Sequence, residues 1–92
     1  MGCWVRALAR VEFYAGSQGF ETPRTLELGG ETLDLEVLAA ATVSRAGASS
    51  PERVWLVRGG ATFFRIGWRL AGVAVDRWLG TEPPATRGHL LA

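Results

Sequence analysis

Arginine and aromatic side chains in the second half of the chain are the residues whose types and spacing could do chemistry. Residues 51–92 carry six Arg and three acidic residues (net +3), whereas residues 1–50 carry four Arg and six acidic residues (net −2). Cationic grooves with aromatic stacking platforms bind single-stranded nucleic acid, and protein interfaces are enriched in the same residue types. We therefore predict a binding surface made of Arg58, Phe63, Arg65, Trp68 and Arg69.

Strand alternation separates part of this surface from the core. In the segment VWLVRGGATFFRI, Trp55 and Phe64 fall on an almost wholly apolar face, which indicates core residues. Arg58, Phe63 and Arg65 fall on the opposite face, where we expect solvent or a partner.

The sequence has no residue set that is typical of catalysis or of a metal site. His89 lies in an aperiodic tail, where it cannot be held as a general base. Cys3 has no partner at metal-ligand spacing, and the chain has no Lys for a Schiff base. Glu27, Asp34 and Glu36 share a polar strand face, which is typical of a solvated surface. We predict a protein that is not an enzyme and has no cofactor.

Length and composition predict one small globular domain. The 92 residues are 48% hydrophobic and 21% charged, with a formal net charge of +1, and this excludes a disordered acidic or basic chain. From Gly80 onward the chain contains Pro83 and Pro84 and has no periodicity. We expect a domain over residues 1–79 and a flexible tail over residues 80–92.

Amino-acid usage also indicates where the protein comes from and where it works. All ten basic residues are Arg, and Lys and Asn are absent, which indicates a GC-rich bacterial genome. A single Cys cannot form an internal disulfide, and no charge-free run approaches the roughly 20 residues that span a bilayer. We expect a cytoplasmic protein without membrane contact.

The clearest structural pattern is TLELGGETLDLEV, which predicts a β-hairpin. A two-residue turn at Gly29-Gly30 pairs Leu28 with Glu31 and Leu26 with Leu33. The second strand is expected to run on through residues 39–43. This register gathers the apolar side chains on one face, and these are Leu26, Leu28, Leu33, Leu35 and Val37.

Other segments predict further strands. Residues 4–14 alternate with a period of two and are followed by an expected loop over residues 15–23. A second hairpin turns at Gly59-Gly60 and pairs Val57 with Thr62, and Gly67 indicates a bulge or bend. Residues 68–78 form a last hairpin about Ala71-Gly72 or, alternatively, a short helix that ends near residue 79.

These elements predict an all-β fold, a small antiparallel five- or six-stranded barrel of SH3-like or OB-like form built from glycine-turn hairpins. Curling the sheet hides edges that would otherwise aggregate. An orthogonal β-sandwich has the same pattern, so both architectures stay open.

Three segments follow one another in order: VEFYAG, then TPRTLELGGETLDLEVL, then VWLVRGGATFFRI with the closing WRL. Pro23 introduces a strand, Gly29-Gly30 makes the turn, and Val37 with Leu38 ends the next strand. This order, over residues 10–78, resembles a family of small bacterial SH3-like domains of unknown function. The Ala run at residues 39–41 departs from the pattern. Similar domains accompany lesion-bypass polymerase-like proteins, so the resemblance implies a setting near DNA repair.

Three functions fit these observations. In the first, the chain is a non-catalytic interaction module that docks on a protein partner with the Arg58, Phe63 and Arg65 face or with a strand edge. In the second, that face binds nucleic acid weakly, because a net charge of +1 does not support strong non-specific binding. In the third, the chain self-associates through its second apolar face across a two-fold axis. We favour the interaction module.

Overall fold

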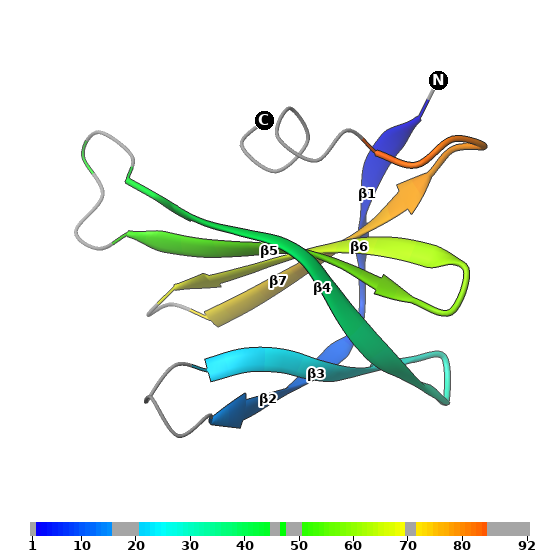
Figure 1. Ribbon diagram of the computed structural model, residues 1–92, viewed down its shortest axis with the longest axis horizontal. Helices are drawn as coiled ribbons and strands as arrows, with labels where there is room; N and C mark the ends of the chain where they lie inside the picture. The colour runs from blue at the N-terminus through cyan, green and yellow to red at the C-terminus, as the bar shows by residue number, and fades with distance from the viewer. Residues whose placement is uncertain (1, 16–20, 45–46, 48–50, 70–71, 85–92) are drawn as a thin grey trace.

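The described residues form one curled antiparallel sheet (Figure 1). The computed structural model describes residues 2–15, 21–44, 47, 51–69 and 72–84, and within these it contains strands and no helix. No membrane-spanning helix is therefore found in the described part of the chain. The order across the sheet is β1-β7-β6-β5-β4-β3-β2. The strands are β1 Cys3–Ala7, β2 Arg10–Ala15, β3 Glu21–Leu28, β4 Glu31–Val43, β5 Glu52–Gly59, β6 Thr62–Arg69 and β7 Gly72–Leu79.

The predicted all-β antiparallel class is confirmed, but the described residues form seven strands instead of five or six. The difference lies at residues 4–14, which form two strands. β1 pairs with β7 and β2 pairs with β3, so the two ends of the strand order are consecutive in the chain. Leu8 between them is 96% exposed, whereas Ala7 and Ala9 pack against the same core. The predicted alternation thus continues through the corner that curls the sheet.

The first hairpin has the predicted register. Leu28 lies opposite Glu31 and Leu26 lies opposite Leu33. Gly29 and Gly30 have φ angles of 59° and 83°, as a two-residue turn of the right twist requires.

The second strand of this hairpin, β4, contains a bulge that the sequence analysis did not predict. The register with β5 shifts between Val37 and Ala39, so that one extra residue enters β4. Before the shift Leu33 and Leu35 pack in the main core, and after it Ala39 and its alternate neighbours pack on the opposite face of β5. Val37 itself is 37% exposed, so it lies outside the core where it was expected.

The second hairpin turns one residue later than predicted, at residues 60 and 61. Val57 lies opposite Phe64 rather than Thr62. Because the pairing moves by two residues, each side chain keeps its predicted face. Gly59 is buried in the strand, where an added Cβ would lie 3.1 Å from Leu35 Cδ2. The first glycine therefore lies against the side chains of Leu33 and Leu35, and the turn uses the second, Gly60, with φ 61°.

Two apolar clusters lie on opposite faces of β5. Trp55 and Phe64 belong to the main cluster, as predicted. A central strand covered on both sides is apolar on both sides, and this explains the unbroken VWLV run. The buried residues of the main cluster are Leu26, Trp55, Val57, Phe64, Ile66 and Val75, and those of the second cluster are Val54 and Leu56, packed by Trp4, Ala39, Ala41 and Val43.

β7 is a strand that pairs with β6, so the expected last hairpin is confirmed and the alternative helix ending near residue 79 is excluded. Gly72, which was expected in the turn, belongs to β7 and lies opposite Arg69, and residues 70–71 lie outside the described residues. Two smaller predictions are wrong. Gly67 pairs in regular register with Val54 and Ala74, without a bulge. Residues 21–23 belong to β3 rather than to the expected loop.

The segment after β7 is described as far as residue 84. Pro84 is buried, and the backbone oxygen of Glu82 accepts a hydrogen bond from Trp78. The rest of the expected tail, residues 85–92 with His89, lies outside the described residues.

Candidate functional site

The predicted surface begins at Arg58 and Phe63, which lie directly opposite each other on β5 and β6. Arg58 also lies opposite Glu36 of β4, and its Nη2 is 3.1 Å from Glu36 Oε1. Both charged side chains are about half exposed, at 49% and 58%. Arg58, which was predicted to bind a ligand, therefore already forms an ion pair with Glu36.

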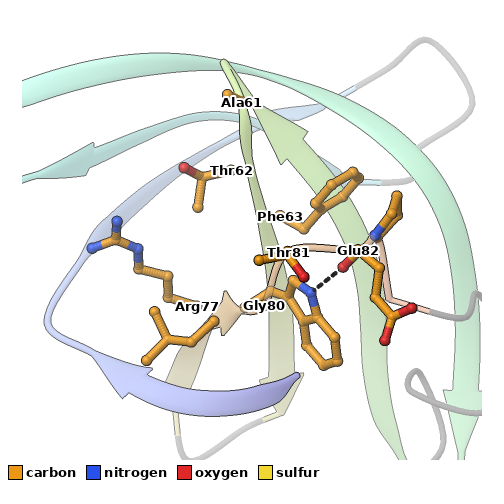
Figure 2. A pocket seen from close by; sticks show the side chains of 10 residues that line it. Ala61, Thr62, Phe63, Arg77, Gly80, Thr81 and Glu82 are labelled. Atoms are coloured by element: carbon orange, nitrogen blue, oxygen red, sulfur yellow. Dashed lines mark hydrogen bonds between the residues drawn. The ribbon is translucent and has the colours of Figure 1, made fainter. Parts of the chain in front are cut away.

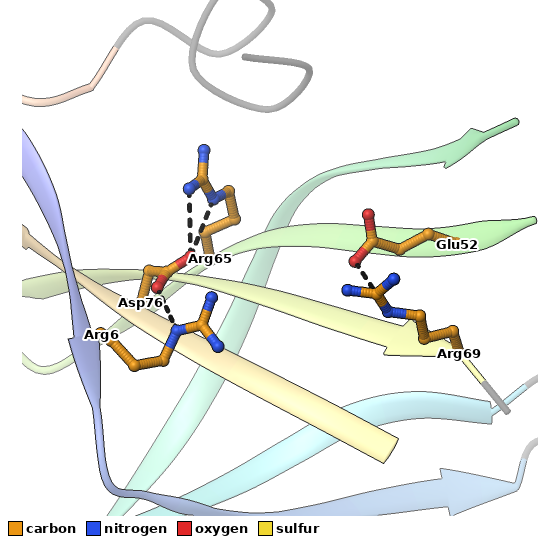
Figure 3. Close-up of polar contacts among 5 residues, drawn as sticks. All are labelled: Arg6, Glu52, Arg65, Arg69 and Asp76. Carbon is orange, nitrogen blue, oxygen red and sulfur yellow. Dashed lines mark hydrogen bonds and ion pairs between the residues drawn. The ribbon is translucent and has the colours of Figure 1, made fainter. Parts of the chain in front are cut away.

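Arg65 is built into the sheet (Figure 3). Its Nε and Nη2 donate to Asp76 Oδ2 at 3.3 and 3.0 Å, across the β6–β7 ladder. Asp76 Oδ1 accepts from Arg6 Nε at 2.8 Å. The side chains of Arg65 and Asp76 are only 19% and 13% exposed, and the guanidinium lies 5.0 Å from the centre of the Trp4 ring. Arg65 thus ties β6, β7 and β1 together.

Trp68 and Arg69 lie at the other end of β6. Trp68 pairs with Arg53 and Val73 and is 37% exposed. By strand alternation it belongs to the face opposite Phe63 and Arg65. Arg69 is six residues, about 20 Å, from Phe63 along the strand. The five predicted residues therefore do not converge on one site.

Arg69 also has an acidic neighbour (Figure 3). Its Nε lies 3.9 Å from Glu52 Oε2. An added Cβ on Gly67 would lie 2.8 Å from that same oxygen. The Glu52 carboxylate thus lies over Gly67 as well as beside Arg69. Arg58, Arg65 and Arg69 therefore each have a carboxylate nearby.

A different feature lies where β6 and β7 separate. The β6–β7 ladder ends at Phe64 opposite Arg77, although each strand continues beyond that pair. Thr62 and Phe63 stay paired with β5, and β7 stays paired with β1 as far as Leu79. The sheet therefore splits between two adjacent strands, and in Figure 1 the arrowhead of β7 points away from the start of β6.

A pocket of about 570 Å³ occupies this split, hereafter the β6–β7 pocket. Figure 2 shows side chains of β6, of β7 and of the segment after β7 around one space. The lining combines aromatic rings, hydroxyl groups and a guanidinium, and comprises Ala61, Thr62, Phe63, Arg77, Trp78, Leu79, Gly80, Thr81, Glu82 and Pro83. Of the predicted binding residues, only Phe63 belongs to it.

The indole of Trp78 holds the segment after β7, which forms one wall of the pocket, in place. Trp78 is 6% exposed, and its Nε1 donates to the backbone oxygen of Glu82 at 2.7 Å (Figure 2). The ring meets Trp4 edge-on, with centroids 5.1 Å apart. An added Cβ on Gly80 would lie 2.9 Å from both Trp78 Nε1 and the Cα of Gly2. The contacts of Gly80 and of the Glu82 backbone with the ring thus hold this segment in place, so the pocket is preformed.

Arg77 is the cation of the pocket. Its side chain is exposed, and it has no ion pair or ring contact with any residue in the described ranges. It lies opposite Val5 of β1 and shares a strand face with Leu79, and these two apolar side chains are 44% and 47% exposed. Apolar side chains beside an uncompensated guanidinium can bind an anionic group attached to an apolar body.

The described residues contain no group of three His, Cys, Asp or Glu side chains that could hold a metal ion. Cys3 is exposed at the start of β1. No protein family, curated protein or solved structure matches this chain. The resemblance to small SH3-like domains therefore stays a prediction, and the function is argued from the geometry of the chain's own residues.

Proposed function

We propose that the chain is a non-catalytic interaction module that docks on a protein partner through the β6–β7 pocket. The observation that carries the proposal is the split in the sheet, because it produces a preformed pocket of about 570 Å³. Pockets of about 300–1,000 Å³ hold small-molecule ligands, so this one has room for a few side chains of a partner. Phe63 and Arg77 supply residue types that are enriched at protein interfaces. The order of the hairpins, which resembles that of domains accompanying lesion-bypass polymerase-like proteins, supports a partner in DNA repair.

The ion pairs of the sheet favour a protein partner over a nucleic acid. Arg58, Arg65 and Arg69 each have a carboxylate within 4 Å. Phosphate binding at these residues would have to displace carboxylates that are already in place, and non-specific affinity depends on the number of free cations.

The proposal is tested by panning a library of linear peptides against three proteins. The first is the wild type. The second carries Thr81→Tyr, which adds a ring to the exposed lining of the pocket. The third is the control and carries Thr32→Tyr, the same change at an exposed position of β4 in the other half of the sheet. We expect a set of peptides that the wild type and T32Y retain and T81Y loses, with unchanged circular dichroism in both variants. Equal retention by all three proteins, or no enrichment at all, refutes docking in the pocket.

The other two functions are outcomes of a parallel measurement. The wild type is titrated into labelled single-stranded DNA, duplex DNA and RNA at two salt concentrations, and its mass is measured by light scattering. Micromolar binding that weakens with salt would replace the proposal with nucleic-acid binding. A dimer at micromolar concentration would replace it with self-association.

A further inference from the structure

We infer that the partner segment enters the split as an added β-strand along Thr62 and Phe63 of β6 and carries an acidic side chain that pairs with Arg77. This inference rests on the proposed function and specifies the chemistry of its ligand.

The backbone of β6 supplies the first argument. On one side, Thr62 and Phe63 pair with Gly59 and Arg58 of β5. On the other side the ladder with β7 has already ended, so this edge of β6 faces the pocket without a partner strand among the described residues. A strand carries N–H and C=O groups along both edges, and such groups need partners when water is excluded. An extended segment that docks here provides them, as in other cases of strand addition.

The shape of the split limits the ligand to an extended chain. β7 continues for only two residues beyond Arg77, and β6 begins two residues before Phe64. Two strand residues span about 7 Å, so the docking edge can pair with a short extended segment. A helix cannot pair with it, because its backbone N–H and C=O groups are already bonded within the helix. The close-packed turn over Trp78 closes the remaining side.

Charge supplies the second argument. Arg77 lines the pocket without a partner in the described ranges, beside the exposed side chains of Val5 and Leu79. Figure 2 places Glu82 on the opposite side of the pocket from Arg77. An acidic residue of the ligand would therefore lie toward Arg77, and its apolar neighbours would contact the exposed apolar side chains.

The test uses three pools of acetylated, amidated and fluorescently labelled seven-residue peptides. Six positions are randomised among Val, Ile, Thr and Phe, and the central position is Glu, Gln or Lys. By fluorescence anisotropy we expect the Glu pool to bind the wild type about fivefold more tightly than the Gln pool, as for a partly exposed ion pair. Arg77→Gln should abolish this preference while still binding the Gln pool. Arg24→Gln, a matched change on exposed β3, should keep the preference.

The backbone part is tested with a fourth pool, in which the Glu peptides carry N-methyl groups at alternate backbone nitrogens. Loss of one or two inserted hydrogen bonds should weaken binding about tenfold. Equal affinity with and without methylation refutes strand addition, and equal affinity of the Glu and Gln pools refutes the pairing with Arg77; both results leave the docking site itself standing. Absence of binding by every pool, together with failed panning, refutes the proposed function.

Discussion

Replacing Asp76 with Asn tests whether Arg65 is a structural residue or a binding residue. Asp76 accepts two hydrogen bonds from Arg65 and one from Arg6, and its side chain is 13% exposed. Asn has nearly the same shape, so Asp76→Asn removes the charge and leaves the packing in place. The Arg65 guanidinium, 19% exposed, would then lose the negative charge of Asp76.

The expected cost follows from the exposure of each partner. Hydrogen bonds to charged groups contribute about 1.5–3 kcal/mol when shielded from water, whereas exposed ion pairs contribute about 0.2–1 kcal/mol. Arg6 is 68% exposed, so its pair should contribute only about 0.5 kcal/mol. We expect Asp76→Asn to lower the free energy of unfolding by about 2 kcal/mol, mostly through Arg65.

A double-mutant cycle in urea measures this directly. Combined with Arg65→Gln, Asp76→Asn should show a coupling free energy of about 1.5 kcal/mol. Combined with Arg6→Gln, the coupling should stay below about 0.5 kcal/mol. A coupling near zero for Arg65 would refute the reasoning.

Three further changes test the core and the wall of the pocket. Leu26→Ala, at a fully buried position, should lower the free energy of unfolding in urea by about 3 kcal/mol, while Leu8→Ser, at a 96% exposed position, should change it by less than about 0.5 kcal/mol; similar costs would contradict the described corner. Gly80→Ala places a Cβ 2.9 Å from Trp78 Nε1 and should cost about 2 kcal/mol in the same assay; a neutral result would mean that the segment after β7 is not close-packed. Trp78→Phe removes a donor to the oxygen of Glu82, so we expect a loss of about 1 kcal/mol and weaker peptide binding; unchanged binding would separate this wall from the pocket.

The sequence predicts the sheet face on which a side chain lies better than it predicts the residue that lies opposite it in the neighbouring strand. The turn of the second hairpin is displaced by one residue, which moves each pair by two positions and leaves the alternation of Trp55 and Phe64 intact. A two-residue turn at Ala71-Gly72 would place Arg65 opposite Trp78, whereas the observed register places it opposite Asp76. The neutralisation of this predicted binding residue could therefore not be seen without the correct turn.

The pocket could not be predicted because it depends on where a ladder stops. Phe63 was identified from alternation, but Arg77 gains its role only because β6 and β7 part just beyond it. That separation is set by the pairings of β6 with β5 and of β7 with β1, and the second pairing joins residues 68 to 76 positions apart in the chain. The only local features in the sequence are the large aromatic residue Trp78 and Gly80 two positions later. They indicate that two backbone segments pack closely here, but they do not indicate which segment packs against Gly80.

The contacts between β7 and β1 that curl the sheet also keep β7 apart from the start of β6. A twisted sheet lets neighbouring strand pairs diverge at its ends, and here β7 is drawn toward β1 by the contacts of Trp78 with Trp4 and of Gly80 with Gly2. Changes at Trp78 or Gly80 should therefore alter stability and binding together, because they release β7 from its place. Changes at Arg77, which is exposed and has no partner in the described ranges, should alter binding alone. Measuring both quantities in each variant thus distinguishes the two kinds of residue. A substitution at a residue that shapes the pocket changes the free energy of unfolding and the affinity together, whereas a substitution at a residue that selects the ligand changes the affinity alone.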